Sequence, residues 1–274
     1  MKIFLMTDLA GVSGVLNYEE WIPPQSPFFP QARRLLTMEV NAAVEGFYTA
    51  GATSVLVVDT VPGGIDLELL DRRTMLVSGF PGPFPYGLDR GFDAMAWVGQ
   101  HAKAGAEHAH LPHTDGFDVL DYRVNGISVG ELGRMAMCAS VLGVPAIFAS
   151  GDEALCREAK ELLPAIETAS VKRGLRSGAG TDMDAAAYRA ANTGALHHHP
   201  LKAFEIVRNG AANALARFRE NTASFPLLGI EAPFSREVAY RADGERKGYT
   251  AGAKHPTDLI AMLNSPEKRE KKKG

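Results

Sequence analysis

The chain has 274 residues, 46% of them hydrophobic and 22% charged, which is the balance of a globular protein with a large buried core. Its formal net charge is −3, and its last ten residues carry five basic and two acidic side chains, so the rest of the chain is acidic. A nucleic-acid binder shows a basic face on its folded part, so we expect no nucleic-acid partner. No apolar run reaches the length of about 18 residues that a membrane span needs, and the N-terminus lacks the pattern of a secretory signal.

The two cysteines, Cys138 and Cys156, fall in segments with helical patterns. Neither has a Cys or His neighbour at the spacing of a zinc or redox motif. We interpret them as small buried hydrophobic residues in a reducing compartment. Together with the missing signal and span, this predicts a cytoplasmic protein.

Strand and helix patterns alternate through the first 150 residues. The apolar run Lys2–Thr7 ends in Asp8, helical spacing follows over 31–50, and the β-branched run Ser54–Asp59 is typical of a buried strand. Strands that are apolar throughout and alternate with helices predict an α/β fold with a mainly parallel sheet flanked by helices. Further strands are expected at 74–78, 94–99, 119–124, 127–129, 146–150 and 168–172, and further helices at 130–142 and 152–163.

Beyond residue 150 the pattern predicts a second, smaller α/β lobe. Its expected helices lie at 182–192 and 202–220, its strands at 227–232 and 237–241, and a short helix follows Pro256. We therefore expect a first lobe over residues 1–150, a second lobe over 151–264 and a disordered basic tail over 265–274.

Three polar residues, Asp8, Asp59 and His101, lie at or just past the ends of expected strands. In open parallel sheets, ligands bind beyond the carboxyl ends of the strands, so each of these residues is a candidate for a site. A carboxylate there can also accept hydrogen bonds from loop amides. Considered alone, Asp8 and Asp59 are better explained as turn caps, and His101 is the stronger candidate.

Four of the eight histidines fall within residues 101–113, at positions 101, 108, 110 and 113. Histidine is the commonest metal ligand and the usual acid or base near neutral pH. The spacing does not match the H-E-x-x-H motif, and we interpret His108 and His110 as polar surface residues. The run His197-His198-His199 before Pro200 is interpreted as a polar turn between two helices, with adventitious metal binding as the alternative.

Glu131 has two competing interpretations. Ser128 and Glu131 stand three residues apart at the start of an expected helix, the spacing of a capping box in which Glu131 reaches back to the amide of Ser128. A carboxylate in the first turn also suits the helix dipole without any functional role. On spacing alone, the cap is favoured over a functional carboxylate.

Motifs of two common enzyme classes are absent from the sequence. Gly11-Val12-Ser13-Gly14 does not match G-x-G-x-x-G, and there is no G-x-x-x-x-G-K-[ST] motif, so a nucleotide site has little support. No G-x-S-x-G motif occurs, so serine-hydrolase chemistry has no support either.

Several short segments together resemble the zinc-dependent D-aminopeptidases of bacterial dipeptide-transport operons. The segments are Asp8-Leu9-Ala10-Gly11-Val12-Ser13-Gly14, residues 55–59, Gly99-Gln100-His101-Ala102, His113, Val129-Gly130-Glu131-Leu132-Gly133, Gly151-Asp152-Glu153 and Glu161-Leu162-Leu163-Pro164. The resemblance implies a two-lobed α/β subunit in a ring-forming homo-oligomer. It also implies hydrolysis of short peptides with an N-terminal D-amino acid by means of two zinc ions.

The resemblance also implies roles for individual residues. Asp8, His101 and Glu131 match metal ligands, and His113 matches the catalytic histidine. Two further ligand positions of the family are occupied by Ala10 and Val61, whose side chains cannot bind a metal.

We therefore expect one divalent ion rather than two. Zinc is the first choice, with manganese or iron open because two carboxylates and one imidazole form a hard ligand set. Substitution of the missing ligands by His108, His110 or Asp59 stays open.

The leading hypothesis is a metal-dependent hydrolase of short peptides or small amides, in which His113 is the general acid and base. A second hypothesis is a binding or assembly protein on the same scaffold. A third is an enzyme of another class, in which Asp8, His101 and His113 form a two-histidine, one-carboxylate iron site.

Overall fold

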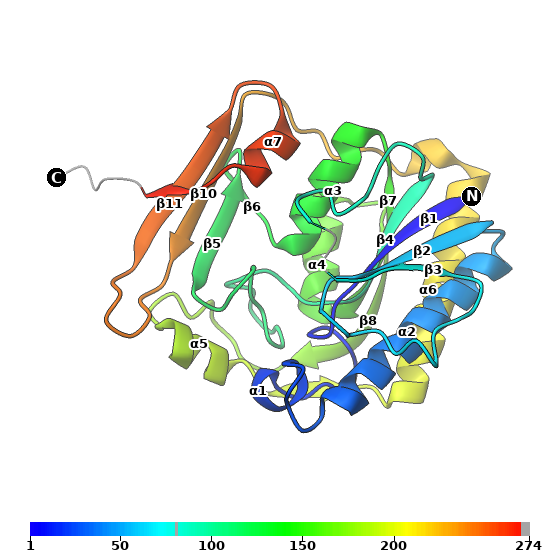
Figure 1. Cartoon of the computed structure of the whole chain (residues 1–274), viewed down its shortest axis with the longest axis horizontal. Helices are drawn as coiled ribbons and strands as arrows, with labels where there is room; N and C mark the ends of the chain where they lie inside the picture. Colours follow the sequence, from blue (N-terminus) through cyan, green and yellow to red (C-terminus); the bar gives the residue numbers. More distant parts are fainter. Residues whose placement is uncertain (80–81, 270–274) are drawn as a thin grey trace.

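Seven strands form the larger of two β-sheets in a computed structural model that describes residues 1–79 and 82–269 (Figure 1). The first six strands in spatial order are parallel, and β9 pairs with β8 in the antiparallel sense. The expectation of a mainly parallel sheet in an α/β fold is thus confirmed. In spatial order the strands are β3 (Met75–Val77), β2 (Ser54–Asp59), β1 (Lys2–Thr7), β4 (Ala94–Gln100), β7 (Ala146–Asp152), β8 (Glu167–Gly174) and β9 (Ala195–His197).

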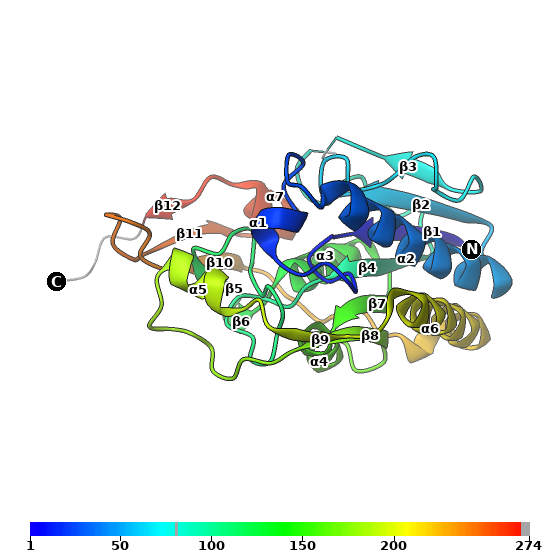
Figure 2. The same ribbon diagram turned by 90° about the horizontal axis from the view of Figure 1, so that it is seen from below.

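Helices cover both faces of this sheet, because alternate side chains of its strands point to opposite sides. In β1, Ile3 and Leu5 belong to the hydrophobic cluster under α2 (Phe29–Thr49) and α6 (Pro200–Glu220), whereas Phe4 and Met6 belong to the cluster under α3 (Glu131–Leu142) and α4 (Glu153–Leu162). Figure 2 shows α2 and α6 side by side. Gly46 permits this close packing, because a Cβ atom there would lie 2.3 Å from the carbonyl oxygen of Arg208.

The second sheet is antiparallel and has five strands. In spatial order they are β12 (Lys268–Arg269), β11 (Tyr249–His255), β10 (Phe234–Tyr240), β5 (Val119–Val124) and β6 (Ile127–Ser128). Figure 1 shows α3 between the two sheets, and buried residues of β5 and β10 pack in the same hydrophobic cluster as α3. The remaining short helices are α1 (Tyr18–Trp21), α5 (Ala185–Ala191), α7 (Leu259–Asn264) and the 3₁₀ helix η1 (Thr222–Ser224).

The division between the two sheets does not follow the boundary expected near residue 151. That boundary falls inside β7, and β5 and β6 of the expected first lobe pair with strands near the C-terminus. β5 belongs to the second sheet because it pairs with β10, more than 100 residues later in the chain. No local sequence pattern predicts such a pairing. The segment 227–232, expected to be a strand, has no regular structure.

The expected disordered tail is partly wrong. Its first five residues are held in place: Lys268–Arg269 pairs with β11, Tyr240 donates a hydrogen bond to Glu267 at 2.6 Å, and Arg236 donates one to the carbonyl of Ser265 at 2.7 Å. Residues 270–274 of the expected tail lie outside the described residues. Within the described part of the chain, no helix is long and apolar enough to cross a membrane.

The carboxyl ends of β1 and β4 bring the site together. The two strands are neighbours with Thr7 opposite Val98, so the segments that follow them leave the sheet side by side. Gly99 has a φ of 73°, and a Cβ atom there would lie 2.1 Å from the carbonyl oxygen of Asp8. Only glycine fits this crossing, which places Asp8 beside the chain that leads to His101.

Candidate metal centre

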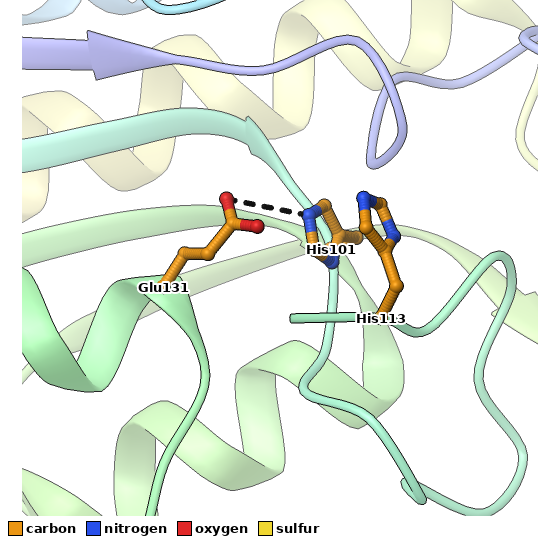
Figure 3. A group of neighbouring side chains, drawn as sticks. All are labelled: His101, His113 and Glu131. Atoms are coloured by element: carbon orange, nitrogen blue, oxygen red, sulfur yellow. Dashed lines mark ion pairs between the residues drawn. The ribbon is translucent and has the colours of Figure 1, made fainter. Parts of the chain in front are cut away.

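Asp8, His101, His113 and Glu131 lie close together at the carboxyl end of the parallel sheet. Nε2 of His101 lies 3.8 Å from Oδ2 of Asp8 and 3.5 Å from Oε2 of Glu131. Figure 3 shows Glu131 at the start of α3 pointing toward His101, with the ring of His113 beside that of His101. The four residues named from the sequence therefore meet in space, although they come from four segments of the chain.

The backbone fixes which nitrogen of His101 faces the carboxylates. Nδ1 lies 3.0 Å from the carbonyl oxygen of Ala102, which can only accept, so Nδ1 carries a proton and donates it. Nε2 is buried, has no hydrogen-bond partner, and faces both Asp8 and Glu131. A bare nitrogen lone pair beside two carboxylates is electrostatically unfavourable, so this position calls for a proton or a metal cation.

Glu131 does not form the capping box that its spacing suggested. Helix α3 begins two residues later than that motif requires, with Gly130 instead of Ser128 at the N-cap and no side-chain cap. Ser128 belongs to β6 and donates its hydroxyl to Asp121 at 2.6 Å. The carboxylate of Glu131 instead accepts from the amide of Asp115 at 2.9 Å and from the side chain of Gln100 at 3.5 Å.

The ring of His113 stacks on that of His101, with centroids 3.7 Å apart and an interplanar angle of 11°. The ring of Phe117 also stacks on that of His113, with centroids 4.7 Å apart. Nδ1 of His113 donates to the carbonyl of Leu111 at 2.8 Å, which leaves Nε2 as the acceptor. Burial, together with the charge of His101, lowers the pKa of His113 to about 3, so this imidazole is neutral near pH 7.

The charges of the centre depend strongly on one another. Burial alone would lower the pKa of His101, but Glu131 and Asp8 outweigh it and raise the pKa to about 10. Burial raises the pKa of Asp8 to about 6, against the effect of His101. Burial would also raise the pKa of Glu131, but His101 outweighs it and holds this pKa well below its usual range. The two carboxylates therefore favour a positive charge at Nε2 of His101.

The donor set suits a divalent metal ion. Ligand atoms of His101, His113 and Glu131 all lie within 4.8 Å of one another, which makes them the one such group among the described residues. Asp8 is outside this group but lies 3.8 Å from His101 on the same side. The fixed tautomer of His101 matches the arrangement in which a metal-binding histidine donates its other N–H to a backbone carbonyl.

A cavity of about 380 Å³ opens on these residues. Asp8, His113 and Glu131 line this cavity, and so do Ala10 and Val61. The two positions that lack the expected ligands therefore face the same space as the ligands that remain. Other apolar or aromatic side chains of the wall are Met6, Tyr18, Ile22, Pro62, Phe84, Tyr86 and Met135.

The other residues considered from the sequence do not replace the missing ligands. Asp59 lies among the backbone amides of Val61, Gly63, Gly64 and Ile65, as expected for a turn cap, and it does not line the cavity.

Two histidines of the 101–113 segment also lie away from the centre. His108 is exposed, as expected. His110 is buried, contrary to expectation: its amide donates to Asp152 at 2.8 Å and its Nε2 lies 3.0 Å from the carbonyl of Leu16.

The three consecutive histidines at 197–199 also differ from expectation. His197 closes β9 and accepts from the amide of Gly14 at 3.1 Å, so this run helps to hold the loop after Asp8.

A buried charged network under that loop was missed. Lys172 donates to the carbonyls of Ala10 at 2.6 Å and Val12 at 3.0 Å, and Glu39 accepts from the amide of Ser13 at 2.9 Å. Lys172 and Glu39 are both buried. The available signal was a charged residue inside an apolar pattern: Lys172 in an expected strand, and Glu39 three residues after Leu36 on the apolar face of a helix.

Comparisons with known proteins relate the chain to one family. A family model described as D-aminopeptidase matches residues 1–247. A D-aminopeptidase of Bacillus subtilis (strain 168) is 31% identical over 177 residues, which cover 63% of this chain and 64% of that protein, so the match spans less than two thirds of the relative. The solved structure of the zinc-dependent D-aminopeptidase DppA of Bacillus subtilis, described as a self-compartmentalizing protease, is 22% identical with a TM-score of 0.79 over 96% of this chain and 94% of that one. That likeness supports the fold, and the match of the family model over residues 1–247 shows that the chain belongs to the D-aminopeptidase family.

Proposed function

We propose that this protein is a metal-dependent hydrolase of short peptides or small amides, with one divalent ion held by Asp8, His101 and Glu131. The observation that carries the proposal is Nε2 of His101, which is buried without a hydrogen-bond partner and faces two carboxylates. Three protein ligands around an open position are typical of catalytic rather than structural zinc sites. Membership of the D-aminopeptidase family supports the choice of an amide substrate.

One ion, rather than two, follows from Ala10 and Val61, which present only aliphatic side chains to the cavity. The zinc dependence of DppA supports zinc as this ion, while manganese and iron also suit a set rich in carboxylates. If these two positions removed a second ion, the double variant Ala10→Glu with Val61→His is expected to raise the metal content from one ion per chain toward two. Unchanged metal content in that variant would contradict this explanation.

The residues of the chain divide the remaining work of hydrolysis. When bound, a divalent ion polarises the scissile carbonyl and makes water more acidic. His113 is neutral near pH 7 and its Nε2 is free to take a proton from the attacking water and to pass it to the leaving amine. The stacked rings of His101 and Phe117 and the hydrogen bond to Leu111 hold His113 in this orientation.

Three wider properties belong to the same proposal. We infer a substrate with an N-terminal D-residue, because the family is defined by that activity. The self-compartmentalizing assembly of DppA supports a ring-forming homo-oligomer for this chain. Location in the cytoplasm is inferred from the two free, buried cysteines, which suit a reducing compartment.

The decisive experiment is metal analysis of the purified protein together with hydrolysis of D-alanyl amide before and after chelation. About one zinc or manganese ion per chain is expected, with activity lost on chelation and restored by the metal. A metal-free protein in which neither ion restores hydrolysis would refute the proposal and favour a binding or assembly role on the same scaffold.

A second candidate function is favoured by one observation, the grouping of His101 and His113 with Glu131 within 4.8 Å. Two histidines and one carboxylate also form the ligand set of non-haem iron oxygenases, and the carboxylate here is Glu131 instead of the Asp8 expected from the sequence. Turnover that requires oxygen and iron, with no hydrolysis by the zinc form, would identify this function.

A further inference from the structure

Three carboxylates are found among the described residues that line the cavity: Asp8, Asp115 and Glu131. Two of them are the proposed metal ligands, and the third has no role in that proposal. The side chain of Asp115 is 57% exposed, so its carboxylate is accessible to a molecule in the cavity. This third carboxylate is the starting point for an inference about the substrate.

Arg134 holds the carboxylate of Asp115 by two hydrogen bonds. Its Nη1 and Nη2 donate to Oδ2 at 2.8 Å and to Oδ1 at 2.5 Å, a bidentate pair, and its side chain is only 4% exposed. The guanidinium lies 4.5 Å from the ring of Tyr122 and 5.4 Å from that of Phe84, so it has little freedom to move. Arg134 therefore fixes the direction in which the carboxylate of Asp115 points.

The backbone ties Asp115 directly to the metal centre. Its amide donates to Oε1 of Glu131 at 2.9 Å, while Oε2 of Glu131 faces His101. Asp115 has a φ of 61°, a left-handed conformation that a non-glycine residue adopts at a local cost. These contacts set Asp115 beside the ligand Glu131, within reach of a group next to the reacting carbonyl.

The carboxylate retains acceptor capacity after the pairing with Arg134. An ionised carboxyl group has about four lone-pair positions, and the two hydrogen bonds from Arg134 use two of them. The remaining positions on the exposed side can accept from a cation in the cavity. In a peptide or amino-acid amide, the cation next to the scissile carbonyl is the α-ammonium group, which is mostly protonated at pH 7.

We propose that Asp115 binds the free α-ammonium group of the substrate and that Arg134 is its positioning residue. The inference rests on the proposed function, because it takes the cavity as the substrate site. An aminopeptidase requires an unblocked amino terminus, and Asp115 is the residue of this chain that recognises it. An amide that lacks this group offers no cation to the exposed acceptor positions of Asp115, so it binds more weakly.

The test compares the binding of D-alaninamide and propanamide, which differ only in the amino group, by titration calorimetry at pH 7 in low salt. Wild type is expected to favour D-alaninamide about 10- to 100-fold, since a hydrogen bond to a charged group is worth about 1.5–3 kcal/mol. In Asp115→Asn the preference is expected to fall to near one, while the affinity for propanamide stays unchanged. Asp243→Asn is the matched control, because Asp243 is 55% exposed, pairs with Arg246 and does not line the cavity.

The outcomes separate this inference from the proposed function. Binding does not require turnover, so a protein that shows the preference but hydrolyses neither amide refutes the hydrolase and supports the ammonium site. A preference that survives in Asp115→Asn, or that wild type never shows, overturns the inference even if hydrolysis is observed.

Arg134→Lys keeps the charge and loses the bidentate geometry. It is expected to reduce the preference for D-alaninamide without changing the metal content, whereas a purely structural role of Arg134 would weaken the binding of both amides equally.

Discussion

Glu39 provides a test of the buried network that supports the loop after Asp8. Glu39 lies in α2 and is fully buried. Its Oε1 accepts a hydrogen bond from the amide of Ser13, and its Oε2 has no hydrogen-bond partner. Burial raises the pKa of Glu39 from 4.5 to about 7, although Ser13 and the ammonium of Lys172 act in the opposite direction. The folded protein therefore retains a proton that the unfolded chain releases near pH 4.5.

The sign and size of the effect follow from this difference. Because the folded pKa is raised, the stability that protonated Glu39 contributes is fully present below about pH 4.5 and is lost as the pH rises to about 7. Each pKa unit corresponds to about 1.4 kcal/mol, so the loss amounts to about 3 kcal/mol. Glu39→Gln keeps an oxygen for the amide of Ser13 and cannot ionise. The free energy of unfolding of the variant, relative to wild type, should therefore rise by about 3 kcal/mol between about pH 4.5 and pH 8.

Urea denaturation of both proteins across this pH range measures the effect. Glu45→Gln is the matched control, because it makes the same substitution on the same helix at a side chain that is 50% exposed. If the difference between wild type and Glu39→Gln were the same at pH 5 and pH 8, Glu39 would be ionised in the folded protein. The account of the buried network would then be wrong.

The remaining predictions concern the metal centre and its loop. His101→Ala should abolish metal binding, whereas His113→Ala should retain the metal and lose about 10²- to 10⁴-fold in hydrolysis; loss of metal in both variants would make His113 a ligand. Gly11→Ala should lower the free energy of unfolding by about 2 kcal/mol or more, because its Cβ atom would lie 2.0 Å from a backbone carbonyl oxygen at the end of β4. Gly194→Ala places a Cβ atom in open space and should leave the free energy of unfolding nearly unchanged. Equal melting temperatures of the two variants would contradict the steric explanation for Gly11.

The six parallel strands of the larger sheet could be predicted from the sequence because they carry a local signal, whereas the antiparallel edge strand β9 was not expected. Apolar runs such as Ser54–Asp59 alternate with amphipathic helices, and this pattern is specific to parallel sheets covered on both faces. The smaller sheet could not be predicted in the same way. Its strand Tyr249–His255 contains glycine, lysine and threonine and has no continuous apolar face, and it is stabilised by pairing with Phe234–Tyr240. A strand of this kind is defined by its neighbour more than by its own residues.

Asp115 and Arg134 show why part of the site was missed. Neither residue stands out in the sequence, since a charged residue in a loop and one in a helix are both ordinary. Their pairing depends on the left-handed backbone of Asp115 and on the position of α3 between the two sheets. A role for these two residues can be inferred only from the structure, in which the buried Arg134 orients the exposed carboxylate of Asp115 at the cavity.

Glu131 shows what decides between two interpretations of one spacing. A capping box requires Ser128 to be the N-cap residue of the helix. The Asn125-Gly126 turn instead places Ser128 in β6, where its hydroxyl donates to Asp121 and not to a helix amide. The helix then begins at Glu131, and the carboxylate points out of its first turn toward His101. Because the amide of Asp115 and the side chain of Gln100 hold the carboxylate there, its cost of burial is offset by contacts outside its own helix. The hairpin that precedes α3 therefore makes Glu131 available to the metal centre, because it keeps Ser128 in β6 and away from the helix N-terminus.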